Sequence, residues 1–209
     1  MPQAPRREVH QDDEEERRMS VDTAATPASS TGTATMTGAS IPVGDPLYNE
    51  VVQFLYEEAR LLDTNRLTEW LGVLAPDLVY RAPLRVTVTR QEGDGVDSVV
   101  GHFEEDFGSL SARVTRLTHT TSPWAEDPPS RTRRFVTNIL VTRTDKAEEV
   151  TVVSNLLVTR NRGSVPGFVL IPAERRDVVR RTPDGWRVAR RVILLDESIL
   201  STPNLAIFL

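Results

Sequence analysis

Three histidines supply the only imidazole side chains of this 209-residue sequence, and imidazole is a common catalytic base and iron ligand. They are His10, His102 and His119. A non-haem iron site with two histidines and one carboxylate needs both imidazoles within coordination distance of one ion. We expect His102 and His119 at opposite ends of one helix, roughly 25 Å apart at ~1.5 Å per residue. This spacing argues against an iron site in the chain.

The sequence contains no cysteine. Disulfides, a cysteine nucleophile, cysteine-ligated zinc and cysteine-ligated iron–sulfur clusters are therefore excluded. The glycine-rich fingerprints of dinucleotide and nucleoside triphosphate binding are missing as well, as is the Gly-x-Ser-x-Gly elbow of many serine hydrolases. These gaps exclude the most recognisable classes of catalytic motif.

Carboxylates are the remaining candidates for acid–base chemistry. A carboxylate pair in the pocket of a cone-shaped fold would need side chains that are shielded from water. Asp77, Asp106 and Asp196 are the candidates. Each of them can instead cap a helix or form an ion pair, and we favour that interpretation.

The elements that would position these residues change in character along the chain. Asp45 is a good N-cap and Pro46 a good first helical residue, and apolar residues then recur at helical spacing. Further along, the hydrophobic period falls to two, which is typical of strands. Helices followed by antiparallel strands predict an α+β fold with a curved sheet packed against helices. We expect helices over 46–63, 66–75 and 102–117, a loop over 92–99, and strands over 78–90, 133–144, 149–161, 168–182 and 186–195.

The first 44 residues have a different composition. They combine a charged run at 12–18 with a Thr/Ala/Ser/Gly/Pro stretch at 23–40, and they contain no aromatic residue. Such a segment has too few large apolar groups to offset the entropy lost on ordering. We expect residues 1–44 to be a disordered low-complexity extension and residues 45–209 to be the folded domain.

The charge balance and hydropathy limit the possible partners. The chain has 25 basic residues, of which 24 are arginine, against 30 acidic residues, so its net charge is -5. A nucleic-acid surface needs clustered positive charge, so we expect no nucleic acid partner. No run approaches the ~20 apolar residues of a membrane span, and the charged N-terminus does not look like a secretory signal. We therefore expect a cytoplasmic protein without membrane contact.

One loop has the composition of a docking site. It contains Trp124, Glu126, Asp127, Pro128, Pro129, Arg131 and Arg133. Consecutive prolines lower the entropy lost when a loop is ordered, and Trp and Arg are frequent interface anchors. The alternative is a rigid loop held by local arginine–carboxylate pairs, and the residues alone leave both interpretations open.

Several segments in order resemble the β (small) subunit of aromatic-ring-hydroxylating dioxygenases. The matching segments include FLYEEARLLD at 54–63, YRAPLR at 80–85, WAEDPPSRTR at 124–133 and ERRDVVRR at 174–181. The resemblance covers about residues 46–209 and is nearest to biphenyl-, cumene- and phenylpropionate-type systems. It leaves the 1–44 extension without a role.

The resemblance implies the cone-shaped fold shared with nuclear transport factor and ketosteroid isomerase. It implies a hexamer of three α and three β subunits, in which the β subunits form a trimeric base and supply no catalytic residue. The α subunit would carry a Rieske [2Fe–2S] cluster and a mononuclear non-haem Fe(II). Electrons would come from NAD(P)H through a reductase, often with a ferredoxin, and the product would be a cis-dihydrodiol.

The residues agree with that division of labour, because a chain without cysteine cannot hold a Rieske cluster. We therefore expect no cofactor in this chain and subunit contacts in place of a catalytic site. The contact residues we expect are those of the 124–133 loop together with Arg160, Arg162, Arg190 and Phe208. The alternatives are an autonomous isomerase or dehydratase of the same fold, or a small-ligand-binding module.

Overall fold

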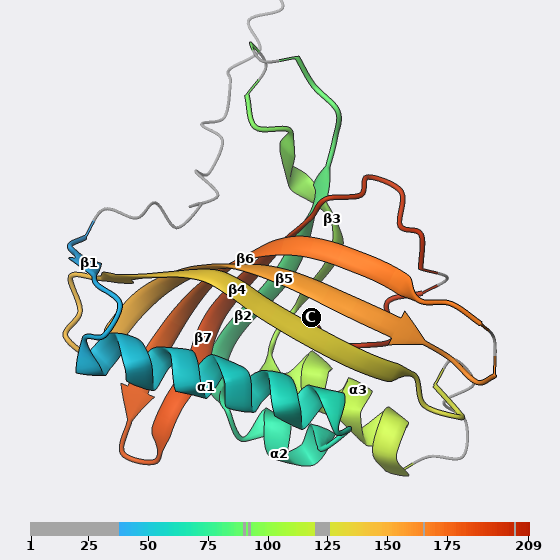
Figure 1. Ribbon diagram of the computed structural model, residues 1–209, viewed down its shortest axis with the longest axis horizontal. Coiled ribbons are helices and arrows are strands. Elements are labelled where there is room, and N and C mark those ends of the chain that lie inside the picture. Colours follow the sequence, from blue (N-terminus) through green and yellow to red (C-terminus); the bar gives the residue numbers. More distant parts are fainter. Residues whose placement is uncertain (1–37, 90, 92, 120–125, 165, 203) are drawn as a thin grey trace, which may run out of the picture. The chain divides into compact units, whose positions relative to one another are not determined.

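Seven strands form one sheet in the order β1–β4–β5–β6–β7–β2–β3 (Figure 1). The computed structural model describes residues 38–209 except 90, 92, 120–125, 165 and 203. Neighbouring strands are antiparallel, except that β2 and β7 run parallel. The strands are β1 (Ser40–Ile41), β2 (Leu74–Arg85), β3 (Val96–Glu105), β4 (Arg131–Arg143), β5 (Glu149–Asn161), β6 (Val169–Thr182) and β7 (Gly185–Leu195).

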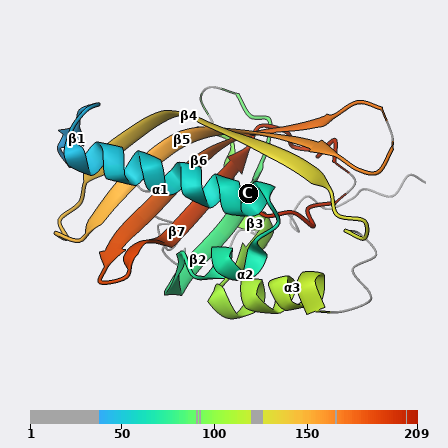
Figure 2. The same ribbon diagram turned by 60° about the horizontal axis from the view of Figure 1, so that its bottom comes forward.

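The helices lie together on one side of the curved sheet (Figure 2). They are α1 (Pro46–Asp63), α2 (Leu67–Leu71) and α3 (Phe107–His119). We call the space between this face of the sheet and the helices the interior. It holds one continuous cluster of buried apolar side chains that draws on all three helices and on β1, β2 and β4–β7. The predicted α+β class is therefore correct.

Helix α1 begins and ends where the sequence predicts. The Asp45 carboxylate accepts a hydrogen bond from the Leu47 backbone N–H at 2.8 Å, which caps the helix, and Pro46 is its first residue. The buried side chains of α1 follow the three- and four-residue spacing of one helical face. One of them is charged: Glu58 faces the interior.

The second predicted helix is too long. The sequence indicated a helix over 66–75, whereas α2 ends at Leu71 and β2 begins at Leu74. The reason is tertiary, because Leu74 pairs with Val188 of β7, and the Val188 N–H donates to the Val73 carbonyl at 2.9 Å. Pro76 falls in the irregular part of this pairing, between the paired positions Leu74 and Val79.

The third predicted helix begins too early. Residues 96–105 form β3, so His102 lies on a strand and the predicted 92–99 loop ends sooner. Phe103 and Phe107 are four residues apart and mimic one helical face, yet they belong to different elements. Phe103 pairs with Ala82 of β2 and stacks on Tyr80 with ring centroids 5.5 Å apart. Helix α3 starts only after Asp106, whose carboxylate accepts from the Ser109 N–H at 2.8 Å.

The folded part starts before the predicted boundary at residue 45. Ile41 in β1 is 4% exposed and pairs with Val141 of β4. Residues 38–44 therefore belong to the fold, and residues 1–37 lie outside the described residues. Strand β1 covers only Val141 and Thr142 on this edge of β4, which also bulges at Asn138, where φ is +52°.

The strands from β4 onward agree closely with the predicted ranges 133–144, 149–161, 168–182 and 186–195. Their inward and outward side chains alternate, as the burial pattern of β6 shows most regularly. None of the helices in the described residues has the length and apolar character that crossing a membrane requires.

Candidate functional site

Four charged side chains from one helix and two strands form a cluster in the interior. Glu58 lies on α1, Arg175 and Asp177 lie on β6, and Arg191 lies on β7. All four are at most 1% exposed. The planar guanidinium of Arg191 bridges the two carboxylates, donating to Glu58 at 2.6 and 2.8 Å and to Asp177 at 2.9 and 2.8 Å. Such paired bidentate bonds are the strongest arrangement available to an arginine.

The electrostatics of this cluster keep the Glu58 carboxylate ionised. Burial alone raises the pKa of Glu58, but the charges of Arg191 and Arg175 and hydrogen bonds from Arg191 and Trp70 outweigh it and lower the pKa to about 2. A carboxylate with such a pKa is a poor proton acceptor at neutral pH. The cluster therefore has the properties of a structural ion network and lacks those of an acid–base site.

Arg175 is the least satisfied member of the cluster. Its guanidinium lies 3.6 Å from Glu58 and 4.0 Å from Asp177, and none of its three nitrogens has a hydrogen-bond partner. Burial and the positive charge of Arg191 lower the pKa of Arg175. Its charge nevertheless balances the cluster, which then holds two acids and two bases.

Apolar side chains, with several aromatic rings among them, fill the rest of the interior. The ring of Trp70 lies 4.5 Å from that of Phe208 and 6.5 Å from that of Tyr80, and Tyr80 stacks on Phe103. A cavity of about 50 Å³ remains where residues 206–208 approach α1 and β4, and these three segments line it together with other residues. A cavity of about 150 Å³ is known to bind benzene. This cavity is too small for an arene.

The predicted acid–base carboxylates lie outside the interior. Asp77 pairs with Arg180 at 2.8 Å and Asp196 pairs with Arg85 at 2.8 Å, and both carboxylates are more than half exposed. Asp106 is the exposed cap of α3. The interpretation as caps and ion pairs is correct for all three, and none of them lines the small cavity.

The histidines are not brought together either. His102 lies on β3 and His119 is the last residue of α3, so the expectation that they bracket one helix is wrong. Among the described residues, no group of three His, Asp or Glu side chains could hold a metal ion. A Rieske cluster does not fit this chain, because half of its ligands would have to be cysteine.

The predicted contact residues that the structure describes fall into three groups by exposure. Two of them face inward: Arg160 is 4% exposed and pairs with Glu126 at 2.5 Å, and Phe208 is 2% exposed. Both have intrachain roles. Glu126, Arg162 and Arg190 are partly buried, and Arg162 donates to the Asp127 carbonyl at 3.4 Å. Trp124 lies outside the described residues. The members exposed on the surface are Asp127, Pro128, Pro129, Arg131 and Arg133.

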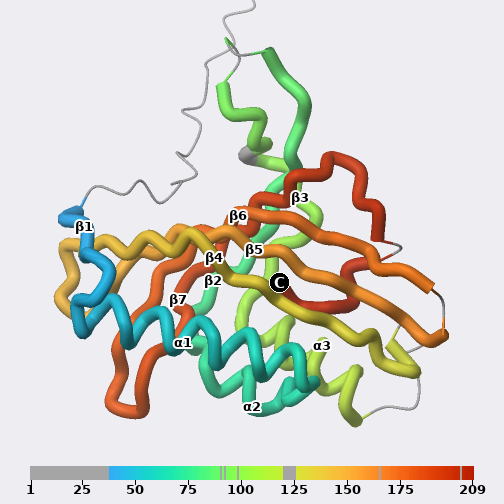
Figure 3. The backbone as a smooth tube through the Cα atoms, viewed as in Figure 1, coloured from blue at the N-terminus to red at the C-terminus, as the bar shows by residue number. Residues whose placement is uncertain are grey.

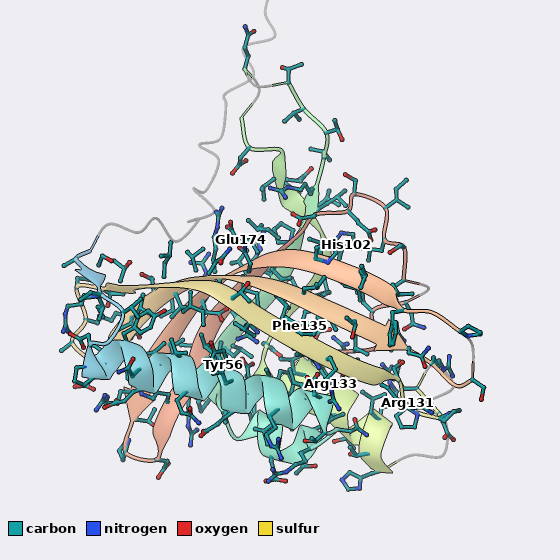
Figure 4. All side chains as sticks on the ribbon, in the orientation of Figure 1. Tyr56, His102, Arg131, Arg133, Phe135 and Glu174 are labelled. Atoms are coloured by element: carbon teal, nitrogen blue, oxygen red, sulfur yellow. The ribbon has the colours of Figure 1, made fainter. Side chains whose placement is uncertain are left out.

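The exposed group lies next to aromatic side chains that the sequence did not single out. Pro128, Pro129, Arg131 and Arg133 line a shallow groove with Phe168, which is 71% exposed. A neighbouring groove is lined by Arg133, Phe135 and Tyr56 of α1, and both aromatic residues are about half exposed. Figure 4 shows Tyr56, Arg131, Arg133 and Phe135 along β4 and the adjacent part of α1. We call this set the β4 surface: Tyr56, Pro128, Pro129, Arg131, Arg133, Phe135 and Phe168.

Sequence reasoning missed the buried cluster and the aromatic part of the β4 surface. A usable signal existed for the cluster, because adjacent arginines on a strand, as at 175–176 and 190–191, must point to opposite faces. One of each pair therefore faces inward and needs an acidic partner. For Tyr56 and Phe135 the sequence carries no comparable signal, because both fit an apolar periodic pattern.

Comparisons with known proteins agree with the residues and the fold. A family described as ring hydroxylating beta subunit matches residues 57–202. Biphenyl 2,3-dioxygenase subunit beta of Rhodococcus jostii is 36% identical over 173 residues, which are 80% of this chain and 91% of that protein.

Two solved structures have a similar fold. Naphthalene 1,2-dioxygenase with indole in its active site superposes with a TM-score of 0.67 at 25% identity, covering 77% of this chain and 84% of that one. A protein of Novosphingobium aromaticivorans, provisionally named scytalone dehydratase, has a TM-score of 0.53 at 12% identity over 72% of this chain and 85% of its own. The second match shows the fold alone. Together they confirm the expected cone-shaped α+β fold.

Proposed function

The chain belongs to the family of ring-hydroxylating β subunits, and from this premise we propose that it is the non-catalytic structural subunit of a Rieske non-haem iron dioxygenase. The complete enzyme would add both atoms of O2 to an arene to give a cis-dihydrodiol, in the catabolism of aromatic compounds. The related proteins are named for biphenyl, benzene and phenylpropionate dioxygenases, and an arene of this kind is the substrate class we propose.

The filled interior is the observation that carries this proposal. A cone-shaped enzyme would need a pocket with an available acid or base. Among the described residues, apolar side chains occupy that space, the buried carboxylates are ion-paired, and the cavity lined by α1, β4 and residues 206–208 is about 50 Å³. No observation favours the alternative isomerase, dehydratase or small-ligand-binding module.

The cofactors would reside in the α subunit. A Rieske cluster needs cysteine ligands that this sequence lacks, so we assign both that cluster and the mononuclear iron to the partner chain. NAD(P)H-derived electrons would reach them through a reductase and often a ferredoxin. The assembly we propose is a cytoplasmic hexamer of three α and three β subunits, with the β subunits as its trimeric base.

The β4 surface is our candidate for a subunit contact in that assembly. It contains three aromatic side chains that are each at least half exposed, together with Arg131 and Arg133. Aromatic and arginine residues are enriched at the centres of interfaces. The consecutive prolines hold its loop in a restricted set of conformations. The 1–44 extension has no proposed role, apart from residues 38–44, which belong to the fold.

Co-purification tests the proposed function. The tagged chain is expressed with an α-type chain from the same organism, isolated through its tag, and analysed for mass, iron and the visible absorbance of an iron–sulfur cluster. We expect a stoichiometric α chain that carries all the iron, whereas the chain expressed alone self-associates and binds none. Stoichiometric iron in the isolated chain, or failure to retain an α chain that is itself soluble, would contradict the proposal.

A further inference from the structure

The last residues of the chain run back into the interior without forming a helix or strand. Residues 204–209 follow a linker over 196–201, in which Ile199 is 90% exposed while Leu200 packs against the core, and they end beside α1 and the inner face of the sheet (Figure 3). Phe208 and Leu209 are 2% and 1% exposed. Because this segment pairs with no strand and forms no helix, side chains of the surrounding elements hold it in place, as they would hold a bound peptide.

Four arginines from four different elements hold the main chain of this segment. They come from α3, β4, β5 and β7, and each of them donates to a different backbone carbonyl. Arg113 donates to Leu205 at 3.0 Å, Arg134 to Phe208 at 2.6 Å, Arg160 to Asn204 at 2.8 Å and Arg191 to Leu209 at 3.2 Å. The Tyr80 hydroxyl adds two bonds, accepting from the Leu209 N–H at 2.8 Å and donating to its carbonyl at 2.7 Å.

Phe208 anchors the segment through its side chain. The centroid of its ring lies 4.5 Å from that of Trp70. The guanidinium carbon of Arg113 lies over the Phe208 ring, 4.6 Å from its centroid. The ring thus gains an aromatic pair and a cation–π contact, and both contacts depend on the position of the ring.

The arginines that contact this segment are also paired within the chain. Each of the four is paired with at least one carboxylate, namely Glu105, Asp63, Glu126, or Glu58 and Asp177. The backbone carbonyls of residues 204, 205 and 208 use remaining N–H groups of these arginines without disturbing the ion pairs.

We propose that the interior is a peptide-binding site, and that residues 204–209 are its ligand, bound in cis. The ligand class is an extended apolar peptide that presents carbonyls to the four arginines and a phenylalanine to Trp70. This inference is independent of the proposed function, because it concerns only contacts within one chain.

The test begins with cleavage of the linker in the full chain. A protease recognition sequence is inserted between Ser198 and Ile199, the purified protein is cut, and size-exclusion chromatography shows whether fragment 199–209 stays with the rest. The cut protein is then refolded from urea with an excess of labelled peptide 199–209. We expect the fragment to be retained after cleavage and the labelled peptide to replace it on refolding.

Peptide variants measure selectivity without altering the protein. We expect the Phe208→Ala peptide to compete on the order of a hundredfold less well, because a buried aromatic anchor is lost, and a scrambled peptide not to compete. In the protein, Arg113→Met should weaken binding about tenfold through the lost charged hydrogen bond. Arg116→Met, an exposed position on the same helix, should leave it unchanged.

Each outcome decides the matter. The proposal is supported if the fragment stays bound after cleavage and the native peptide, but not the scrambled one, replaces it. It is also supported if cleavage unfolds the protein and the native peptide, but not the scrambled one, restores the fold. The proposal is overturned if the fragment separates while the unfolding transition stays unchanged. It is equally overturned if the scrambled peptide replaces the fragment as well as the native peptide does, or if no peptide replaces the fragment after refolding.

Discussion

Each face of the central strands carries side chains that are unusual for its environment. On the inner face of β6 and β7, within the apolar core, the charged residues Arg175, Asp177 and Arg191 are at most 1% exposed. On the outer face of β4 and β6, Phe135, Leu140 and Leu170 are each more than half exposed. A small group of charges is thus buried and several large apolar side chains are exposed, although isolated exposed apolar residues are common on any protein.

This contrast indicates that the two faces have different roles, one in stability and the other in partner binding. Buried charges must be paired, so those on the inner face act as rigid connections between α1, β6 and β7 and are not available for chemistry. Exposed aromatic groups gain free energy only when another surface covers them. The inner face therefore maintains the fold, and the β4 surface on the outside is where we expect a partner.

The largest effect should come from breaking the inner network. Replacing Arg191 with methionine leaves Glu58 and Asp177 buried without their bidentate partner, and such removals typically cost about 3–5 kcal/mol. We expect the free energy of unfolding, measured by urea titration, to fall by about that amount.

The matched control for that variant is Arg187→Met on the same strand. Arg187 pairs at 3.2 Å with Asp184, whose side chain is 79% exposed, so the change should be within ~1 kcal/mol. If both substitutions lowered the free energy of unfolding equally, burial of the charges would not determine their contribution to stability. The stabilising role of the inner face would then be contradicted.

The next effect is a loss of stability in acid. The pKa of Glu58 is about 2 in the folded chain, against 4.5 for an unperturbed carboxyl. Because the folded pKa is the lower one, the stabilisation is fully present above pH 4.5 and disappears as the pH falls from 4.5 towards 2. Its size over that window is about 3 kcal/mol.

Unfolding titrations at several pH values with a Glu58→Gln variant measure this contribution. The variant should lose less stability between pH 4.5 and 2 than the parent chain, whereas Glu57→Gln, on the exposed side of the same helix, should follow the parent. A Glu58→Gln curve parallel to the parent curve would mean that Glu58 is not the group that titrates.

The smallest effect on stability, and the largest on assembly, should come from the β4 surface. We expect Phe135→Ser to change the free energy of unfolding by no more than about 0.5 kcal/mol, as for an exposed position, and to reduce the amount of partner subunit retained in a pull-down. Leu140→Ser is the control on the same strand, since Leu140 is 54% exposed compared with 51% for Phe135. Equal retention by both variants would rule out the β4 surface as a contact.

The sequence was most informative where local signals and tertiary pairing agree. Helix α1 has a cap, a leading proline and a single apolar face, so its limits could be predicted. Phe103 shows the opposite case, because its spacing to Phe107 matches a helix while pairing with β2 places it in a strand. Local periodicity cannot report a partner that is distant in the sequence.

The candidate site was predictable in kind and only partly in position. The absence of cysteine excluded a Rieske cluster from this chain, and the resemblance to β subunits added the expectation of contacts in place of catalysis. Arg160 and Phe208 were expected in subunit contacts, and the structure gives both an intrachain role because the end of the chain returns to the interior. The apolar residues at 205–209 indicate that this end is buried, but the four elements that hold it are distant in the sequence and could not be identified from it.

The short β1 strand has a consequence for aggregation. Among the described residues, it covers only two residues of one edge of the thirteen-residue strand β4, and an open edge of that length can recruit strands from other molecules. Two features of β4 oppose this: the bulge at Asn138 interrupts the hydrogen-bonding register, and the exposed arginines at 131, 133 and 143 place charge along the strand. We therefore expect an association through β4 to use side-chain contacts, which can be limited to a fixed number of subunits, and not open-ended strand addition.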